Sequence, residues 1–227
     1  MSRTGLFIAL AIGVVSGLVF GIYPELDLWV SGLFYDPSPL GFWLRLSPFV
    51  EGLRNTASLI ITYIAAPAAI GLILKAARPR LPFYLSTRVM VFLLGTLALG
   101  PGLLVNMGLK TYWDRPRPYS VTQFGGTEHF VPWWDTSGDC HRNCSFVAGE
   151  PSGAFWTLAP ATLAPPQWRA AAYGAALAFG AFVGVLRLIV GGHFLSDIIF
   201  AGVFVFLLIW AAHRLLFGRP PEGPPGR

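Results

Sequence analysis

Long apolar stretches constrain this chain more than any other feature of its sequence. A helix needs about 20 mainly apolar residues to cross the hydrocarbon core of a bilayer. Windows that approach this length and composition occur at residues 5–23, 56–77, 88–109, 150–164, 168–186 and 193–217. We therefore predict an all-α membrane protein with six transmembrane helices packed in a bundle.

The composition also favours a single membrane domain. Apolar residues make up 54% of the 227 residues and charged residues only 12%, whereas soluble domains carry about 25% charged residues. We predict one six-span domain over residues 1–218 and a tail over residues 219–227, whose Pro- and Gly-rich composition is typical of disorder. The fourth window is the least regular, because Pro160 interrupts it and its first residues are polar.

The first window has two interpretations. Arg3 precedes an apolar run, as in a secretory signal peptide, but no convincing small-residue cleavage motif follows. An uncleaved first span is therefore the preferred interpretation. Gly13, Gly17 and Gly21 recur every four residues along it, a spacing that favours close packing against another helix.

The distribution of basic residues predicts the orientation in the membrane. With the N-terminus inside, nine Lys and Arg residues fall on the inner side and seven on the outer side. Three of those seven, Lys110, Arg117 and Arg187, are binding-site candidates and therefore poor topology signals, which leaves nine against four. Both termini are predicted to be cytoplasmic, with three loops on the outer side.

Two outer segments contain further local patterns. In residues 24–55, Leu26, Trp29 and Leu33 fall near one helical face, which predicts either a helix along the lipid headgroups or a loop that packs on the bundle. Cys140 and Cys144 lie in the sequence C-H-R-N-C of the next outer loop. An oxidising periplasm favours a disulfide between them, with free thiols as the alternative. A metal site is disfavoured, because two Cys and one His at this spacing match no common zinc pattern.

Ionisable residues gather at the outer ends of the third, fifth and sixth windows. Lys110 and Arg117 lie in K-T-Y-W-D-R-P-R-P, and Arg187, His193 and Asp197 lie in R-L-I-V-G-G-H-F-L-S-D. Ionisable groups at membrane depth are costly and indicate function, although a lysine there can simply reach the interface. Asp197 follows His193 by one helical turn, so its carboxylate can hold one imidazole nitrogen and leave the other as a base or nucleophile.

The spacings Lys110-x6-Arg117-Pro118 and Arg187-x5-His193-x3-Asp197 resemble the first and third motifs of the type 2 phosphatidic acid phosphatase family. This family comprises membrane lipid phosphatases related to vanadium haloperoxidases. The resemblance implies that His193 attacks phosphorus to form a phosphohistidine and that Asp197 orients it. Lys110, Arg117 and Arg187 would hold the phosphate oxygens, since planar guanidinium groups match phosphate and positive charge stabilises phosphoryl transfer. We therefore expect neither a metal nor another cofactor.

The middle motif departs from the family pattern, which is usually P-S-G-H with a histidine that protonates the leaving oxygen. Residues 147–150 (VAGE) and residues 151–154 (PSGA) are the two candidates. We prefer the first, because it follows a Ser-Phe pair and supplies an ionisable group. The third motif departs as well, since Leu186 stands where the family usually has serine.

On this interpretation Glu150 is the general acid, provided that burial raises its pKa against the opposing effect of nearby arginines. His129 and His141 are the alternative proton donors. Gly149 lies where backbone N–H groups at a helix start could bind the phosphate.

The sequence therefore predicts a phosphatase of the bacterial inner membrane with a periplasmic site, which hydrolyses a lipid phosphoric monoester or diphosphate. Its candidate substrates are an isoprenoid carrier diphosphate, lipid A 1-phosphate, phosphatidylglycerophosphate and phosphatidic acid. A lipid-to-lipid phosphotransferase and a non-catalytic phospholipid-binding or transport protein remain alternatives. We expect no nucleic-acid partner and no obligate protein partner.

Overall fold

The computed structural model describes residues 1–38, 41–80 and 82–218, and within these residues the chain is helical without a β-strand. The predicted tail at residues 219–227 lies outside them. The long helices are α1 (Arg3–Ile22), α3 (Pro48–Ala77), α8 (Pro166–Ile189), α9 (Leu195–Phe217) and a continuous helix of α4 (Thr87–Leu97), η1 (Ala98–Leu109) and α5 (Lys110–Tyr112). The short ones are α2 (Glu25–Gly32), η2 (Pro118–Ser120), η3 (Thr122–Phe124), α6 (Gly149–Phe155) and α7 (Leu158–Thr162).

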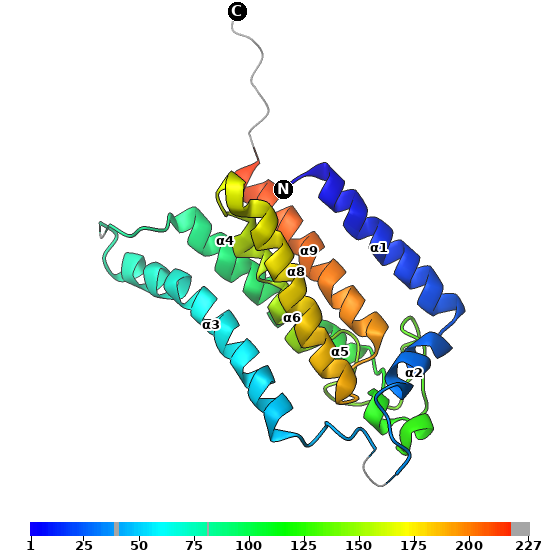
Figure 1. Cartoon of the computed structure of the whole chain (residues 1–227). Coiled ribbons are helices and arrows are strands. Elements are labelled where there is room, and N and C mark those ends of the chain that lie inside the picture. The colour runs from blue at the N-terminus through cyan, green and yellow to red at the C-terminus, as the bar shows by residue number, and fades with distance from the viewer. Residues whose placement is uncertain (39–40, 81, 219–227) are drawn as a thin grey trace, which may run out of the picture.

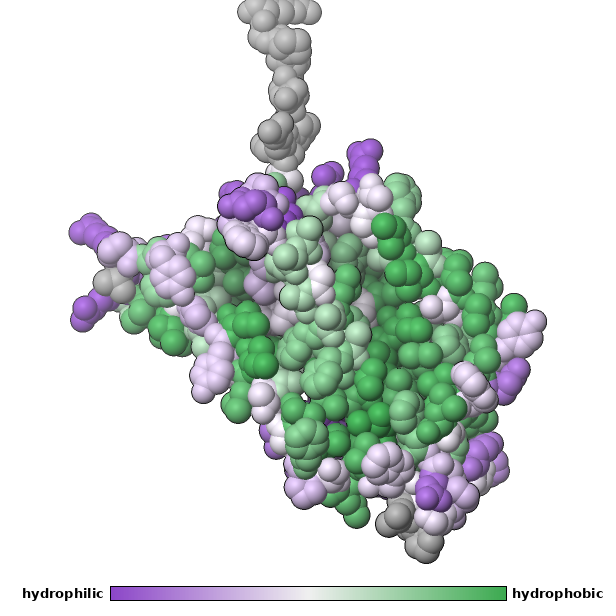
Figure 2. All heavy atoms as spheres, in the orientation of Figure 1, coloured by the Kyte–Doolittle hydropathy of each residue, from purple (hydrophilic) through white to green (hydrophobic). Residues whose placement is uncertain are grey.

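Five helices in the described residues are long and apolar enough to cross a membrane. They are α1, α3, the continuous α4–α5 helix, α8 and α9, and they run side by side through the bundle (Figure 1). Figure 2 shows a broad hydrophobic surface over these helices, with hydrophilic residues concentrated toward the two ends. The all-α membrane architecture is therefore confirmed, whereas the count of six spans is not.

The fourth predicted window, residues 150–164, differs from a span because it folds as two short helices, α6 and α7. Pro160 has no N–H to donate to the carbonyl of Trp156, and the N–H of Ala159 bonds that carbonyl instead, at 2.8 Å. Both short helices are largely buried, α6 against α3, α8 and α9, and α7 against α4, α8 and α9. As a result, the start of α6 lies inside the bundle rather than at its edge.

The packing of α1 follows its glycine pattern. A Cβ atom at Gly13 would lie 3.2 Å from Val203 of α9, and one at Gly17 would lie 3.4 Å from Trp133. The indole N–H of Trp133 donates to the carbonyl of Gly17 at 3.1 Å. The small residues therefore allow α1 to approach α9 and the loop that precedes α6.

The start of α1 and the end of α9 lie at the same end of the bundle (Figure 1). The N-terminal amino group is 3.5 Å from Nδ1 of His213, and the indole N–H of Trp210 donates to the carbonyl of Ser2 at 3.2 Å. Helix α2 and the segment of residues 113–148 lie at the opposite end. The residues of the candidate site belong to this second end.

Helix α2 lies in the first outer segment, where the sequence left a helix and a loop as alternatives, and it buries two polar side chains. Trp29 and Leu33 are 65% and 62% exposed, and Val30 packs on the hydrophobic core. Asp27 and Ser31 are fully buried on the opposite face. The buried carboxylate of Asp27 connects this helix to the site described next.

Candidate active site

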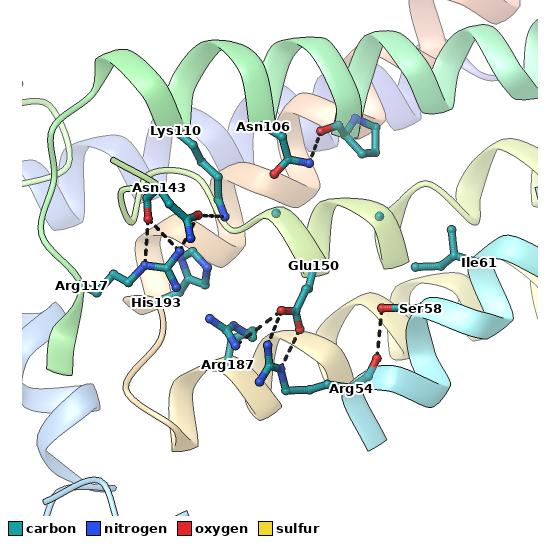
Figure 3. Close-up of a pocket in the computed structure, with 13 residues that line it drawn as sticks. Arg54, Ser58, Ile61, Asn106, Lys110, Arg117, Asn143, Glu150, Arg187 and His193 are labelled. Carbon is teal, nitrogen blue, oxygen red and sulfur yellow. Dashed lines mark hydrogen bonds and ion pairs between the residues drawn. The ribbon is translucent and has the colours of Figure 1, made fainter. Parts of the chain in front are cut away.

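A cavity of about 490 Å³ opens at the end of the bundle remote from the chain termini. Six of the predicted site residues line it, namely Lys110, Arg117, Gly149, Glu150, Arg187 and His193. Figure 3 shows their side chains converging from α5, α6, α8 and the loops beside them. Asp197 lies behind His193 and is completely buried. The structure thus brings together residues that are far apart in the sequence.

His193 is held with one ring nitrogen engaged. Its Nδ1 lies 2.8 Å from the backbone carbonyl of Ser145, so Nδ1 carries the proton in this contact and Nε2 has the lone pair. Burial, followed by the positive charges of Arg187, Arg117 and Lys110, lowers the pKa of His193 well below its usual value of 6.5. The imidazole is therefore neutral near physiological pH and is suited to act as a nucleophile.

Asp197 supports His193 less directly than the sequence suggested. The distance from its Oδ2 to Nδ1 of His193 is 3.8 Å, too long for a hydrogen bond. The same Oδ2 instead accepts hydrogen bonds from the hydroxyl of Ser145 and from the N–H of Phe194 at 2.9 Å. Asp197 therefore fixes the two segments on either side of the imidazole, the one that carries Ser145 and the start of α9.

Arg115, which was not predicted as a site residue, is a cationic partner of Asp197. It is fully buried, and its guanidinium group donates to Asp197 and, at 2.8 Å, to Asp27 of α2. Asp27 also accepts the backbone N–H of Ser196 at 3.0 Å. Paired charges of this kind offset the cost of burial, and they attach α2 to the first turn of α9.

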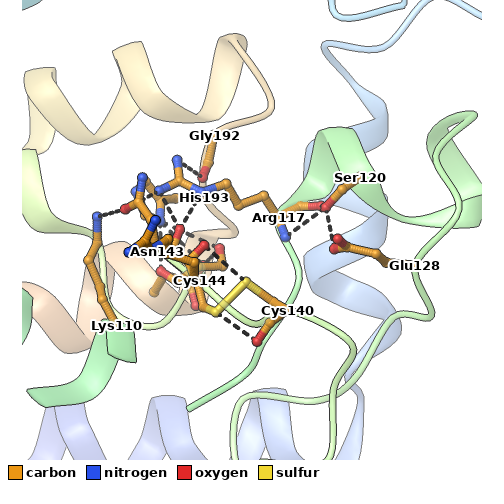
Figure 4. The surroundings of a disulfide bond; sticks show 12 residues. Lys110, Arg117, Ser120, Glu128, Cys140, Asn143, Cys144, Gly192 and His193 are labelled. Atoms are coloured by element: carbon orange, nitrogen blue, oxygen red, sulfur yellow. Dashed lines mark hydrogen bonds and ion pairs between the residues drawn. A yellow bond between two sulfur atoms is a disulfide. The ribbon is translucent and has the colours of Figure 1, made fainter. Parts of the chain in front are cut away.

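The lysine and the first arginine of the predicted phosphate clamp share one partner, Asn143 (Figure 4). Oδ1 of Asn143 accepts from Nζ of Lys110 at 3.2 Å and from Nη2 of Arg117 at 2.8 Å, and its backbone carbonyl accepts from Nε of Arg117 at 3.0 Å. Asn143 has a φ of 55° and lies in the small loop closed by the Cys140–Cys144 disulfide. Asn143 is therefore the residue of the disulfide loop that lines the cavity.

Arg187 completes the cationic side of the cavity. Its guanidinium group lies directly over Gly192, where a Cβ atom would be only 2.5 Å from Nη2. Among the described residues its buried Nε has no hydrogen-bond partner. A buried donor of this kind is costly unless something accepts from it, and an anionic ligand in the cavity would do so. Leu186, at the family's serine position, instead packs beside Val50 and Val190.

Glu150 forms a two-point ion pair with Arg54 of α3. Nε of Arg54 lies 2.9 Å from Oε2 and Nη2 lies 2.6 Å from Oε1, while Nη1 of Arg187 is 3.5 Å from Oε1. Burial alone would raise the pKa of Glu150, but the hydrogen bonds from Arg54 and the charge of Arg187 outweigh it and lower the pKa. The structure therefore favours a carboxylate, and a general acid would need a proton that this arrangement opposes.

The alternative residues of the sequence analysis lie elsewhere. His129 is an exposed side chain of the long loop, 3.3 Å from Asp139, and His141 is exposed in the disulfide loop. Neither lines the cavity. In the second candidate motif, residues 151–154, Gly153 lines the cavity and Ala154 is buried in a small apolar cluster. Of the two candidate motifs, only residues 147–150 contain an ionisable side chain, Glu150, and it lines the cavity.

The cavity lining also includes residues that were not predicted from the sequence, among them Arg54, Asn106 and Asn143. Asn106 lies one turn before Lys110, and its amide donates to the carbonyl of Pro101 at 2.7 Å within the π-helical segment η1. π-helical turns are frequent at functional sites. A polar residue within the third apolar window was the available signal for Asn106.

The arrangement can carry out nucleophilic transfer of an anionic group. A neutral histidine lies among three cationic side chains, and the carboxylate of Glu150 lies 3.5 Å from one of them, Arg187. Fixed positive charges of this kind stabilise a transferring phosphoryl group.

Comparison with known proteins decides the family. The family model described as the PAP2 superfamily matches residues 88–221, more than half of the chain. The chain belongs to the PAP2 superfamily. It is a membrane lipid phosphatase, and thus a phosphomonoester hydrolase that acts on lipids.

Three similar proteins share one name. A lipid A 4'-phosphatase of Francisella tularensis subsp. novicida is 32% identical over 96% of this chain and 98% of its own length. A lipid A 4'-phosphatase of Rhizobium leguminosarum is 31% identical over 86% of this chain and 88% of its own length. A third, from Rhizobium etli, is 42% identical over 46% of this chain and 41% of its own length. No solved structure matches significantly.

Proposed function

We propose that this protein removes the 4'-phosphate of lipid A through a phosphohistidine intermediate on His193. The substrate rests on the similarity of nearly the whole chain to a lipid A 4'-phosphatase. The chemistry rests on one observation, the neutral His193 with Nε2 unprotonated in a cavity lined by Lys110, Arg117 and Arg187.

In the first half-reaction, the lone pair on Nε2 of His193 forms a bond to phosphorus while the bond from phosphorus to the sugar oxygen breaks. The three cationic side chains balance the charge on the phosphoryl oxygens. The leaving oxygen takes a proton from Glu150, which takes that proton from the solvent as the substrate binds. The negative phosphate beside it and the loss of Arg187 to the phosphate both raise the proton affinity of Glu150.

In the second half-reaction, Glu150 is again a carboxylate and takes a proton from a water molecule. The water oxygen bonds to phosphorus, the P–N bond breaks, and its electron pair returns to Nε2. Asp197, through Ser145, keeps the imidazole in position during both steps. Gly149 leaves room for the ammonium group of Lys110, because a Cβ atom there would lie 3.1 Å from Nζ of Lys110.

We further propose that the protein lies in a bacterial inner membrane with both termini in the cytoplasm and the site facing the periplasm. The excess of basic residues on the side of the termini favours this orientation. The start of α1 and the end of α9 lie at the same end of the bundle, which supports placing both termini on one side of the membrane. The disulfide of Cys140 and Cys144 suits an oxidising compartment.

The test is an assay of purified protein with lipid A that carries phosphate at both the 1- and the 4'-position, followed by mass spectrometry of the products. The expected result is free phosphate and loss of the 4'-phosphate alone, with no reaction in His193→Ala. Preferred hydrolysis of lipid A 1-phosphate, isoprenoid diphosphate, phosphatidylglycerophosphate or phosphatidic acid would contradict the proposed substrate. Phosphate on a second lipid would indicate a phosphotransferase, and saturable binding without release would indicate a binding or transport protein.

A further inference from the structure

Arg54 belongs to a part of the chain that precedes the family-matched segment of residues 88–221. It projects from the first turns of α3 into the cavity, where Figure 3 shows it beside Glu150 and Arg187. Its two contacts with Glu150, at 2.9 and 2.6 Å, form a two-point ion pair. This geometry fixes both the position and the orientation of the carboxylate.

The carboxylate of Glu150 opposes phosphate binding. Oε1 of Glu150 is 3.5 Å from Nη1 of Arg187, so Glu150 competes with phosphate for the same guanidinium group and repels the phosphate dianion. The contact with Arg54 is shorter, at 2.6 Å. The carboxylate is thus already held by a cation outside the predicted phosphate clamp, and among the described residues the Nε of Arg187 has no hydrogen-bond partner.

We propose that Arg54 is a positioning residue that keeps Glu150 off the phosphate clamp and in place for proton transfer. Glu150 occupies the position where the family usually has a histidine, and a carboxylate there needs a cationic partner that a histidine does not. Helix α3 supplies that partner. The inference rests on the proposed function for the role of Glu150, although the effect on phosphate binding can be measured without turnover.

The ionisation of Glu150 depends on every charged group that faces it. These groups are Arg54 of α3, Arg187 of α8, Lys110 of α5, Arg117 of the following loop and His193 before α9. Removal of Arg54 leaves Arg187 as the nearest cation. Glu150 would then move toward Arg187, and its pKa would rise because its strongest partner is lost.

The experiment compares Arg54→Gln, Arg54→Lys, Glu150→Gln and the double variant Arg54→Gln/Glu150→Gln. The probes are inorganic phosphate, whose binding is measured by calorimetry, and the lipid substrate, for which kcat and KM are measured across pH. The matched control is Arg142→Gln, which removes an exposed arginine from the disulfide loop. Thermal unfolding in detergent verifies that each variant is folded.

Arg54→Gln is expected to weaken phosphate binding and raise KM by about tenfold, which corresponds to about 1.4 kcal/mol. It should also shift the acidic limb of kcat to higher pH, since Glu150 must be a carboxylate in the second half-reaction. The double variant should recover phosphate binding, because the competing carboxylate is gone, but not kcat. Arg54→Lys should lie between wild type and Arg54→Gln, and Arg142→Gln should behave as wild type.

Two results overturn the inference: phosphate binding and a pH profile in Arg54→Gln that match the control, or a double variant that binds phosphate no better than Arg54→Gln. Both are independent of the proposed function, which fails if wild-type protein releases no phosphate from lipid A or if His193→Ala remains active. A folded Arg54→Gln with unchanged phosphate affinity therefore rejects the role of Arg54 while the role of His193 stands.

Discussion

At the residue scale, Asn143 joins the disulfide loop to the phosphate clamp. Its left-handed backbone, with φ of 55°, is tolerated by asparagine and glycine but strained in alanine. Asn143→Gly therefore removes the side-chain contacts with Lys110 and Arg117 without backbone strain, and it retains the carbonyl contact with Arg117. We expect KM for the lipid substrate to rise by about tenfold, as the loss of one or two charge-assisted hydrogen bonds implies.

Steady-state kinetics of Asn143→Gly beside His141→Ala, an exposed neighbour in the same loop, measures this effect. His141→Ala should retain the wild-type KM. Equal KM values in the two variants would mean that the side chain of Asn143 does not organise the clamp.

The pKa of His193 gives a second prediction at this scale. Burial and the charges of Arg187, Arg117 and Lys110 lower it, so the imidazole should remain neutral and nucleophilic as the pH falls below 6.5. An NMR titration of ¹⁵N-histidine-labelled protein, with the His193 signal identified by its loss in His193→Ala, reports this directly. Arg187→Gln should bring the pKa of His193 closer to its usual value. Titration of wild-type His193 at or above 6.5 would be incompatible with this electrostatic environment.

The residues that sequence reasoning found and those it missed differ in kind. The presence of Lys110, Arg117, Arg187 and His193 at one site was predictable, because ionisable residues at fixed spacing near the ends of apolar windows are rare and costly. Arg54 and Asn143 carry no such pattern, and their contacts are with residues far away in the sequence. Glu150 is 96 positions from Arg54, and Lys110 and Arg117 are 33 and 26 positions from Asn143. The ionisation of Glu150 depends on that unpredicted contact with Arg54 and therefore could not be decided from sequence.

At the element scale, α2 is a structural part of the site although it precedes the family-matched segment. Asp27 shares the fully buried Arg115 with Asp197 and accepts the N–H of Ser196 at the start of α9. Asp27→Asn removes one partner of a buried ion pair, which costs about 3–5 kcal/mol in comparable cases. We expect a clear loss of stability together with a lower kcat, since Arg115 can then draw Asp197 away from Ser145.

Chemical unfolding in detergent, combined with the phosphatase assay, tests this role of Asp27. Glu25→Gln is the matched control, because it removes a carboxylate from the exposed face of the same helix. If both variants unfold at the same denaturant concentration, the link between α2 and the nucleophile has no energetic consequence.

The long helices were predictable from the sequence, because each corresponds to a long apolar window. Five of the six windows correspond to helices long enough to span a membrane, and the fourth was already the least regular because of Pro160. At the division between α6 and α7, the carbonyl of Trp156 accepts a hydrogen bond from the N–H of Ala159. The indole N–H of Trp156 donates to the carbonyl of Leu93 and to the hydroxyl of Thr96, both in α4. Such tertiary contacts are absent from the hydropathy pattern.

At the scale of the whole molecule, the orientation in the membrane is open to a direct test. His129 lies in the long loop beside the site, and Tyr84, 75% exposed, lies in the connection between α3 and α4. In intact cells, a membrane-impermeant maleimide should label His129→Cys and should label Tyr84→Cys only after permeabilisation. The two native cysteines give no background, because they form a disulfide. The reverse labelling pattern would place the site in the cytoplasm.

The central claim is that a lipid phosphate is transferred to His193 before water releases it. The most direct measurement is a rapid acid-free quench of the protein with its lipid A substrate, followed by peptide mass spectrometry. We predict a phosphoryl group on the peptide that contains His193, on the histidine itself, and no such modification in His193→Ala. Rapid release of phosphate with no modified histidine at any time, or full activity in His193→Ala, would contradict the account.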